Sequence, residues 1–506
     1  MSSWRFIWSS LVYHWRMNVA VVLGVAVGAA VLTGALLVGD SVRGSLRHLM
    51  LDRLGSIDEV LVSDHLFGAA LVTQFSALPD FNEDFEAAAP AILLDGSLSQ
   101  PDSGARANRV TLLGISDAFW KLGSDGPQPA VTEGEVVLNQ PLAEELSVQV
   151  GDDVVVRLPL PADIPPDSPL GKKTELIANR RLRLAEIIPA EGLGRFGLRP
   201  NQQTPRNCYL TLADLQAALN QRDRLNAIFV AGKSPTEPAP DAAEARLPDL
   251  LHPKLPDYGL ALRETPLGYF NLTSERMVLP PAVERAALAA FESEHPQVAL
   301  TYLANYILAG PDDQGKIPYS TIAALDLTDV PPLGPFTTLD GTQILNLADD
   351  EILLNTWAAD DFASQGVELK PGDTIRLEYF EPESTHGASV ETTHEFKLRG
   401  IVELKGPAAD PDFTPELRGV TDKESLANWN PPFPYDSSRV RTRPPHDEDE
   451  RYWNEHRATP KGFVSLKTGR RLWASRFGQS TSVRIPRREG LSITDLATRL
   501  EAELAK

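Results

Sequence analysis

The sequence contains little cysteine and little positive charge. Its single cysteine, Cys208, excludes an internal disulfide and any metal cluster built on cysteines. Cys208 stands between Asn207 and Tyr209 at the start of an apolar pattern, which predicts a buried side chain that acts as a small hydrophobe. With 48 Lys and Arg against 69 Asp and Glu, the net charge is −21. This balance argues against nucleic-acid binding and against a polybasic surface for lipids.

Motifs for catalysis and for cofactors are missing or incomplete. The sequence has no G-x-S-x-G, Walker or H-E-x-x-H motif. Residues 192–197 satisfy the dinucleotide-binding pattern G-x-G-x-x-G, but prolines 200 and 205 follow where that fingerprint needs a helix. The acidic run 446–450 is predicted to be solvated charge, because a cation site needs ligands around one centre. We therefore predict no catalytic, cofactor-binding or metal-binding residue.

One long hydrophobic run is present, at residues 17–39, and it carries no charged residue. About 20 apolar residues are needed to cross a bilayer as a helix. A secretory signal has a shorter apolar region, and no cleavage site follows this run, so we predict a transmembrane anchor. Arg5 and Arg16 precede the run, and no acid occurs before Asp40. Positive charge stays on the cytoplasmic side, so the N-terminus is expected inside and the body outside.

Residues 1–16 form a leading segment rich in tryptophan. Trp4, Trp8, Leu11, Val12 and Trp15 recur at spacings of three and four residues, which places them on one helical face. Indole rings suit the headgroup region, so the segment is expected to be a cytoplasmic amphipathic helix along the membrane surface. A simple extension of the spanning helix fits the pattern equally well.

An internal repeat organises the rest of the chain. The run 135–139 (EVVLN), an alanine, a Gly-Asp pair and an alternating apolar run recur from residues 351–355 (EILLN) onward. Three further blocks recur in the same order: 181–189 with 395–403, 209–212 with 463–466, and 226–230 with 481–485. Chance similarity of short apolar runs could explain one block but hardly all four. We therefore predict two related lobes.

The residues within these blocks predict an α+β fold. Each EVVLN-like run favours a strand, and its asparagine is placed to end the strand and begin a helix. The Gly-Asp pair predicts a tight turn, because Gly tolerates positive φ and Asp can bond its own backbone. The next alternating run is then the return strand. This mixed order argues against a doubly wound parallel sheet.

The repeat divides the extracytoplasmic body into residues 40–300 and residues 301–506. The second part contains an insertion, residues 406–460, with two Pro-Pro pairs and the acidic run. The matching stretch of the first part is far shorter, so the lobe can form without the insertion. It is either a surface excursion with its own partner or a solvated insertion, and its composition favours the second.

These features together resemble the permease subunits of MacB/FtsX-type ABC transporters. That family shares a basic, aromatic leading segment, a first spanning helix and a large extracytoplasmic domain. The repeated block with its Gly-Asp pair looks like the signature of the MacB-like periplasmic core domain, as does the run at 463–485. Residues 317–326 (IPYSTIAALD) resemble a strand found in the longer permeases of this group. The resemblance covers nearly the whole chain.

The resemblance implies a protein of the inner (cytoplasmic) membrane that couples ATP-driven motion to an extracytoplasmic domain, which exports or extracts a substrate. The implied partners are a cytoplasmic ABC ATPase subunit, the lipid bilayer, and a further permease subunit or C-terminal half. Family permeases perform no covalent chemistry themselves. The resemblance therefore implies no catalytic residue, no cofactor and no enzymatic activity.

The chain departs from the family pattern in one respect. Family permeases have further spanning helices after the extracytoplasmic domain, whereas this sequence reaches Lys506 without a second apolar run. The N-terminal portion of a permease is therefore expected. The alternative is a single-pass, membrane-anchored binding or scaffolding protein without transport activity. An anchored exported hydrolase is less favoured, since it would need a polar cluster that converges only in three dimensions.

Overall fold

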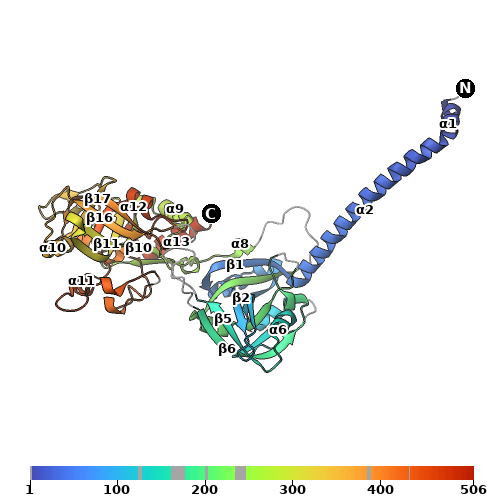
Figure 1. Ribbon diagram of the computed structural model, residues 1–506, viewed down its shortest axis with the longest axis horizontal. Helices are drawn as coiled ribbons and strands as arrows, with labels where there is room; N and C mark the ends of the chain where they lie inside the picture. The colour runs from blue at the N-terminus through green and yellow to red at the C-terminus, as the bar shows by residue number, and fades with distance from the viewer. Residues whose placement is uncertain are drawn as a thin grey trace.

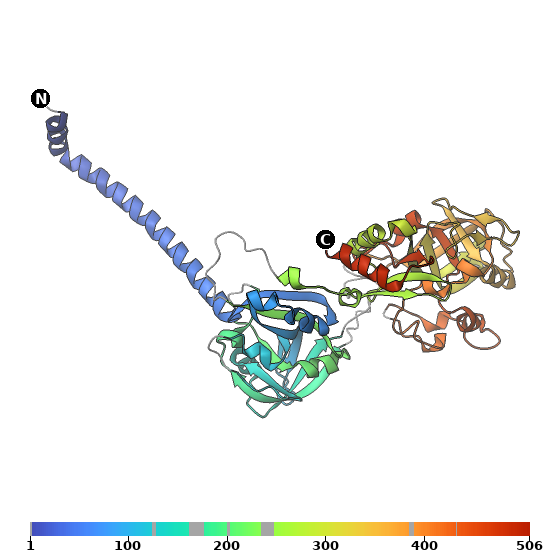
Figure 2. The same ribbon diagram turned by 180° about the vertical axis from the view of Figure 1, so that it is seen from behind.

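The computed structural model describes residues 3–123, 128–160, 177–199, 203–233, 247–383, 389–431 and 433–506. It begins with the short helix α1 (Ser3–Tyr13) and the long helix α2 (Trp15–Leu54), which projects away from the body in both views (Figures 1 and 2). Within the described residues, α2 is the one helix that is long and apolar enough to cross a membrane. Its 40 residues span roughly 60 Å. The helix thus continues past the apolar run as a stalk, residues 40–54.

The first lobe is built on a sheet of eight strands in the order β1-β8-β2-β3-β7-β4-β6-β5. Because β5 also pairs with β2, the last six strands of this order close into a barrel. The strands are β1 (Ile57–Gly68), β2 (Phe85–Ser99), β3 (Arg106–Ile115), β4 (Glu135–Asn139), β5 (Asp153–Pro159), β6 (Ile177–Ile188), β7 (Asn207–Thr211) and β8 (Arg224–Gly232). Short helices connect them: α3 (Ala70–Ser76), α4 (Phe81–Asp84), α5 (Asp117–Trp120), α6 (Gln140–Leu146), the 3-10 helix η1 (Gly192–Arg195) and α7 (Leu212–Leu219).

The second lobe is built on a sheet of nine strands in the order β12-β18-β15-β17-β16-β11-β19-β10-β9, and β11 also pairs with β12. The strands are β9 (Leu260–Glu264), β10 (Tyr269–Ser274), β11 (Gln297–Ala309), β12 (Gly315–Leu325), β15 (Glu351–Asn355), β16 (Thr374–Phe380), β17 (Glu391–Val402), β18 (Gly462–Ser465) and β19 (Ser482–Pro486). The helices are α9 (Pro281–Ala290), α10 (Thr356–Ser364), α11 (Glu448–His456), α12 (Leu466–Trp473) and α13 (Ile493–Leu504). A small ribbon, β13 (Phe336–Thr337) with β14 (Gln343–Ile344), lies outside this sheet.

Both sheets have the same strand order when β2 to β8 are matched with β11, β12 and β15 to β19. The directions of pairing also agree: β4 runs parallel to β6, and β15 runs parallel to β17. Even an irregularity is shared, because the register of each of these two pairs shifts after the second residue, Val136 or Ile352. The four sequence blocks lie on these matched strands. The described body is therefore a mixed α+β structure, rich in sheet.

The Gly-Asp pairs form the tight turns that the sequence predicts. Gly151 has φ +100° and Gly372 has φ +95°, the left-handed region that favours glycine. In each turn the aspartate side chain accepts a backbone N–H from three residues earlier, Gln149 at 2.8 Å or Lys370 at 2.7 Å. The prediction of a turn followed by a return strand is confirmed at β5 and β16.

Apolar side chains fill each barrel. In the first lobe one cluster includes residues of all six barrel strands, among them Ile92, Leu138 and Leu184. Cys208 lies in this cluster, fully buried, which confirms the prediction of a buried small hydrophobe. Burial raises the pKa of its thiol above the ordinary value, so it stays protonated. In the second lobe the equivalent cluster also includes side chains from α9, α12 and α13.

The division between the two sheets falls earlier than the boundary expected at residue 300. Strands β9 and β10 pair in the second sheet, because β10 lies against β19 from Tyr269 to Thr273. Helix α9 also contributes side chains to the second core. The change of lobe thus lies between the end of β8 at Gly232 and the start of β9 at Leu260.

The two lobes lie side by side along the long axis of the molecule (Figures 1 and 2). Polar contacts join the end of β1 to the segment that precedes β9 and to Arg276, which follows β10. His65 Nε2 lies 2.7 Å from the carbonyl oxygen of Asp257, and Gly68 N–H donates to the Asp257 carboxylate at 3.0 Å. Arg276 donates to the carboxylate of Asp64 at 2.8 Å. Because Arg276 binds it, the Asp64 carboxyl has a pKa below its ordinary value.

Candidate functional site

The first candidate region is the junction where the stalk of α2 meets the first barrel. Arg53 is 2% exposed, and Leu54 packs against a core cluster of the lobe. Asp52 accepts a hydrogen bond from the backbone N–H of Gly192 at 3.3 Å. Ser56 donates its backbone N–H and its hydroxyl to the carbonyl oxygen of Leu122, at 2.8 and 2.9 Å. The helix is thus bound to the barrel at its last turn.

Gly55 makes this junction tight. It ends α2 with φ +59°, a conformation that side chains rarely adopt. A Cβ atom at this position would lie 2.4 Å from the carbonyl oxygen of Leu122. Burial, together with the nearby charge of Arg195, lowers the pKa of Arg53 from its ordinary value. The burial of the Arg53 guanidinium at the foot of the helix therefore depends on the close contacts that form this junction.

The first residues of the G-x-G-x-x-G pattern lie at this junction, where the backbone N–H of Gly192 binds Asp52. Residues 192–195 form η1, a single 3-10 turn, where the fingerprint needs a longer helix. Gly194 is required by packing, because a Cβ atom there would meet the carbonyl oxygen of Pro189 at 2.3 Å. Pro205, one of the two prolines that follow, accepts a hydrogen bond from buried Asn139 at 2.7 Å, and residue 200 lies outside the described residues.

The second candidate region is the insertion of the second lobe, residues 406–460. The sequence predicts a solvated segment, and this prediction is wrong for its described part. Leu417, Val420, Leu426, Phe433 and Trp453 form a core cluster of their own, against which Leu303 of β11 packs. The insertion is thus a folded layer that covers one side of the barrel.

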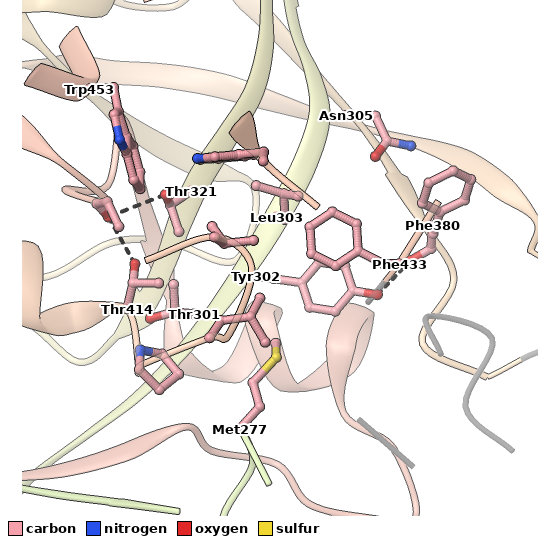
Figure 3. Close-up of a pocket in the computed structure, with 15 residues that line it drawn as sticks. Met277, Thr301, Tyr302, Leu303, Asn305, Thr321, Phe380, Thr414, Phe433 and Trp453 are labelled. Carbon is pink, nitrogen blue, oxygen red and sulfur yellow. Dashed lines mark hydrogen bonds between the residues drawn. The ribbon is translucent and has the colours of Figure 1, made fainter. Parts of the chain in front are cut away.

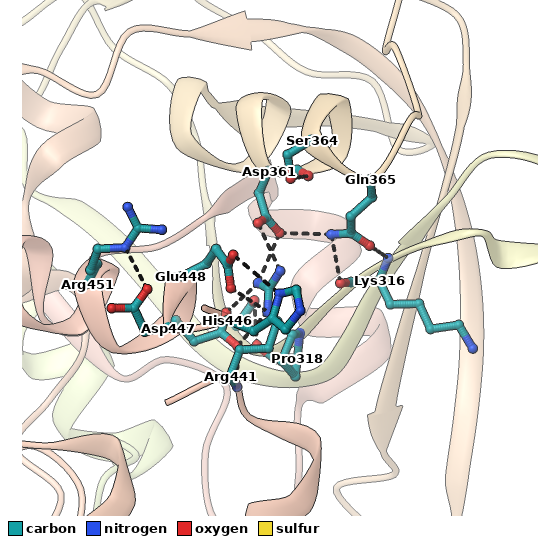
Figure 4. Close-up of polar contacts among 12 residues, drawn as sticks. Lys316, Pro318, Asp361, Ser364, Gln365, Arg441, His446, Asp447, Glu448 and Arg451 are labelled. Carbon is teal, nitrogen blue, oxygen red and sulfur yellow. Dashed lines mark hydrogen bonds and ion pairs between the residues drawn. The ribbon is translucent and has the colours of Figure 1, made fainter. Parts of the chain in front are cut away.

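A buried set of charges fastens this layer to α10 (Figure 4). The guanidinium of Arg441 donates to both carboxylate oxygens of Asp361 at 2.9 and 3.0 Å. It also donates to both oxygens of Asp449, at 3.0 and 2.6 Å. Both aspartate side chains are 3% exposed. Burial lowers the pKa of Arg441, but its hydrogen bonds to the two aspartates outweigh this effect and hold the pKa above its ordinary value.

Asp449 corrects the prediction made for the acidic run 446–450. His446 is exposed, as solvated charge would be, but Asp449 is buried in the contact with Arg441. A sequence signal for this existed: Tyr452 and Trp453 follow Asp449 by three and four residues, which places all three on one face of α11, and all three are buried. The second carboxylate bound by Arg441 could not be inferred, because Asp361 is 80 residues away in the chain.

Lys461 lies fully buried beside this set of charges. Its ammonium group lies over the rings of Trp357 and Tyr452, 4.4 and 4.7 Å from their centroids. The Asp449 carboxylate is 3.9 Å away. Burial lowers the pKa of Lys461 to about 8, and the attraction of Asp449 only partly offsets this. Within the described residues, no group of three or more His, Cys, Asp or Glu side chains is placed to hold a metal ion.

An apolar pocket of about 70 Å³ lies between β11 and the insertion (Figure 3). Tyr302 and Leu303 of β11 form one wall, and Phe433 and Trp453 of the insertion form the other. The pocket lies on the second lobe. Sequence reasoning missed it, because its two walls come from segments more than a hundred residues apart.

Comparisons with known proteins give matches among solved structures. No protein-family model matches the sequence, and no curated protein matches it. The periplasmic region of MacB from Actinobacillus actinomycetemcomitans is similar in structure, with 12% identity and a TM-score of 0.23, over 37% of this chain and 82% of that one. The extracellular domain of the noncanonic ABC-type transporter YknZ from Gram-positive bacteria shows 9% identity and a TM-score of 0.23, over 35% and 84%. Values this low assign neither a family nor a function.

Proposed function

We propose that this chain is the membrane-anchored, extracytoplasmic portion of a MacB/FtsX-like ABC permease. In this role it would pass movement of the membrane segment to a periplasmic body. The observation that carries the proposal is the continuity of α2, which runs from the apolar span through the stalk to the barrel without a loop. A continuous helix bound at its last turn transmits tilt and rotation, whereas a flexible linker would absorb them. The order of the repeated sequence blocks supports the same assignment.

The partners proposed for this function are a cytoplasmic ABC ATPase, the lipid bilayer, and a further permease subunit or C-terminal half that supplies the remaining spans. ATP-driven closure would move α2, and its foot at Asp52 and Ser56 would carry the first barrel with it. The contacts of His65 and Arg276 would then pass the movement to the second lobe. We propose no covalent chemistry for this chain, since the buried charges around Arg441 bind one another.

Purification of the full-length chain from its native membrane tests the proposal. We expect a P-loop ATPase and further spanning segments in the same complex, identified by mass spectrometry. Two glycines inserted after Arg47 should leave that complex intact but reduce substrate-stimulated ATP hydrolysis, because the stalk would no longer be rigid. Two alanines inserted at the same place keep the helix continuous. They control for the rotation of one part of the helix relative to the other that any two-residue insertion causes. A complex of extracytoplasmic proteins alone would favour the anchored scaffold instead.

The proposed orientation has its own test, which the single buried cysteine makes simple. Ser9 and Ser45 are exposed on either side of the apolar run. In a Cys208→Ala background, Ser45→Cys should react with a membrane-impermeant maleimide added to intact spheroplasts. Ser9→Cys should react only after the membrane is opened. The reverse pattern would place the body in the cytoplasm and contradict the proposal.

A further inference from the structure

The pocket between β11 and the insertion is lined mainly by apolar side chains and by hydroxyls that already have partners, while the indole N–H of Trp429 has no hydrogen-bond partner. The hydroxyls of Thr301 and Tyr302 donate to the carbonyl oxygens of Phe413 and Phe380, both at 2.7 Å. Thr414 donates to the carbonyl oxygen of Ala458 at 2.8 Å, a contact drawn in Figure 3. Among the described residues that line the pocket there is no acid, lysine, arginine or histidine. A charged or strongly hydrated ligand would therefore lose its water without replacement.

The size of the pocket limits its occupant further. Sites for drug-sized ligands are typically about 300–1,000 Å³, and this pocket holds about 70 Å³. An apolar cavity of roughly 150 Å³ is known to bind benzene, and this pocket is about half that size, which favours a group narrower than an aromatic ring. A narrow alkyl chain of a few carbons fits. Met277, Leu303 and Val420 offer it the aliphatic surface that such a chain contacts.

We propose that this pocket binds the end of an unbranched alkyl chain that belongs to a neutral molecule. The chain end enters between Leu303 and the aromatic side chains of the insertion, and the polar end of the molecule stays in water at the open mouth. The wall formed by the insertion is held in place by Arg441, which binds it to α10. The proposal concerns binding alone, and it does not depend on the transport function proposed above.

A series of n-alcohols tests the length limit. The full-length chain in lipid nanodiscs is labelled with pentanol that carries a photoreactive diazirine on its alkyl chain. Labelled peptides are located by mass spectrometry, and labelling within 297–309 and 411–431 reports the pocket. Unlabelled ethanol, propanol, butanol, pentanol and hexanol then compete. Each added methylene should lower the half-inhibiting concentration about fourfold, which corresponds to 0.8 kcal/mol, until the chain fills the pocket and the gain stops.

Adsorption to the bilayer or to a general apolar surface gives a different result, because it has no length limit. The half-inhibiting concentration would then continue to fall with every carbon, and this outcome would overturn the proposal. Labelling that no alcohol reduces would overturn it as well. Labelling displaced by an apolar peptide but by no alcohol would point to a protein partner and reject the alkyl ligand.

Variants of Leu303 separate the pocket from other surfaces. This side chain is partly exposed, so the barrel core does not depend on it. Leu303→Trp should fill the pocket and remove the competed labelling. Leu303→Ala should enlarge the pocket, so that the half-inhibiting concentration stops falling at a longer alcohol. This second variant keeps the test valid if Leu303→Trp fails to fold. Leu339→Trp is the matched control on the same lobe, 63% exposed and outside the pocket, and should leave the series unchanged.

Discussion

At the scale of single residues, Arg441 decides whether the insertion stays on the barrel. One guanidinium binds two carboxylates that are almost completely buried, and these come from α10 and α11. Removal of one partner from such a set leaves buried charge without compensation. Replacement of Arg441 should therefore be far more costly than replacement of an exposed arginine in the same insertion.

We expect Arg441→Met to lower the free energy of unfolding of the second lobe by about 3–5 kcal/mol, the range for breaking a buried ion pair. Urea unfolding followed by tryptophan fluorescence measures this change. Arg451 is the matched control, since its side chain is 61% exposed and pairs at 3.1 Å with Asp447, the residue just before α11. Arg451→Met should cost about 0.5 kcal/mol or less. Equal losses for the two variants would contradict the assigned role of Arg441.

Lys461 should make stability depend on pH in the alkaline range. Burial lowers its pKa from 10.5 to about 8, so between these values the unfolded chain holds a proton that the folded chain has released. The unfolding free energy then rises with pH in this window, because the unfolded state binds more protons. Below about pH 8 both states are protonated, and the full cost of the buried charge remains.

Unfolding of the wild type and of Lys461→Met from pH 7 to 11 measures this effect. The difference in unfolding free energy should move in favour of the wild type between about pH 8 and 10.5 and be constant below that window. Lys405→Met, with a side chain that is 80% exposed, should follow the wild type throughout. If the Lys461→Met curve is parallel to that of the wild type, the amine titrates near its ordinary pKa and the argument fails.

At the scale of elements, the sequence predicts local structure well and long-range pairing poorly. The strands β4 and β15, their turns and the burial of Cys208 follow from short patterns whose physics is local. Closure of each barrel depends on β2 with β5 and β11 with β16, pairs that no local pattern specifies. The burial of Asp449 was missed for a related reason, since its partner Arg441 is held in place by Asp361 of the distant helix α10.

The junction of α2 offers a prediction at this scale. Gly55→Ala should loosen the foot of the helix, because positive φ costs a side chain about 1–2 kcal/mol and the new Cβ meets Leu122. Hydrogen exchange at residues 50–56 and 192–196 should become about tenfold faster, while exchange in the barrel core stays unchanged. The control is Gly44→Ala in the exposed stalk, where a Cβ meets nothing within 4 Å and should strengthen the helix. Unchanged hydrogen exchange in Gly55→Ala would mean that the close contact at Gly55 does not stabilise the foot of the helix.

At the scale of the whole molecule, the matched barrels suggest two folding units joined by polar contacts. Each barrel has a separate hydrophobic cluster, and the contacts between the lobes involve a few side chains such as Asp64, His65 and Arg276. Such contacts are hydrated and contribute little to cooperativity. The lobes are therefore expected to unfold in two transitions, although a single chain connects them.

A matched pair of core variants tests this expectation. Leu138 in β4 and Leu354 in β15 occupy equivalent positions in the repeat, and both are completely buried. Leu138→Ala should lower the stability of the first lobe by about 2–5 kcal/mol, and Leu354→Ala should do the same for the second lobe. Differential scanning calorimetry, with hydrogen exchange to assign each transition, should show that each variant shifts one transition and leaves the other in place. If either variant shifts both transitions together, the lobes are one cooperative unit, and movement of α2 would then reach the distant pocket through a rigid body without any hinge.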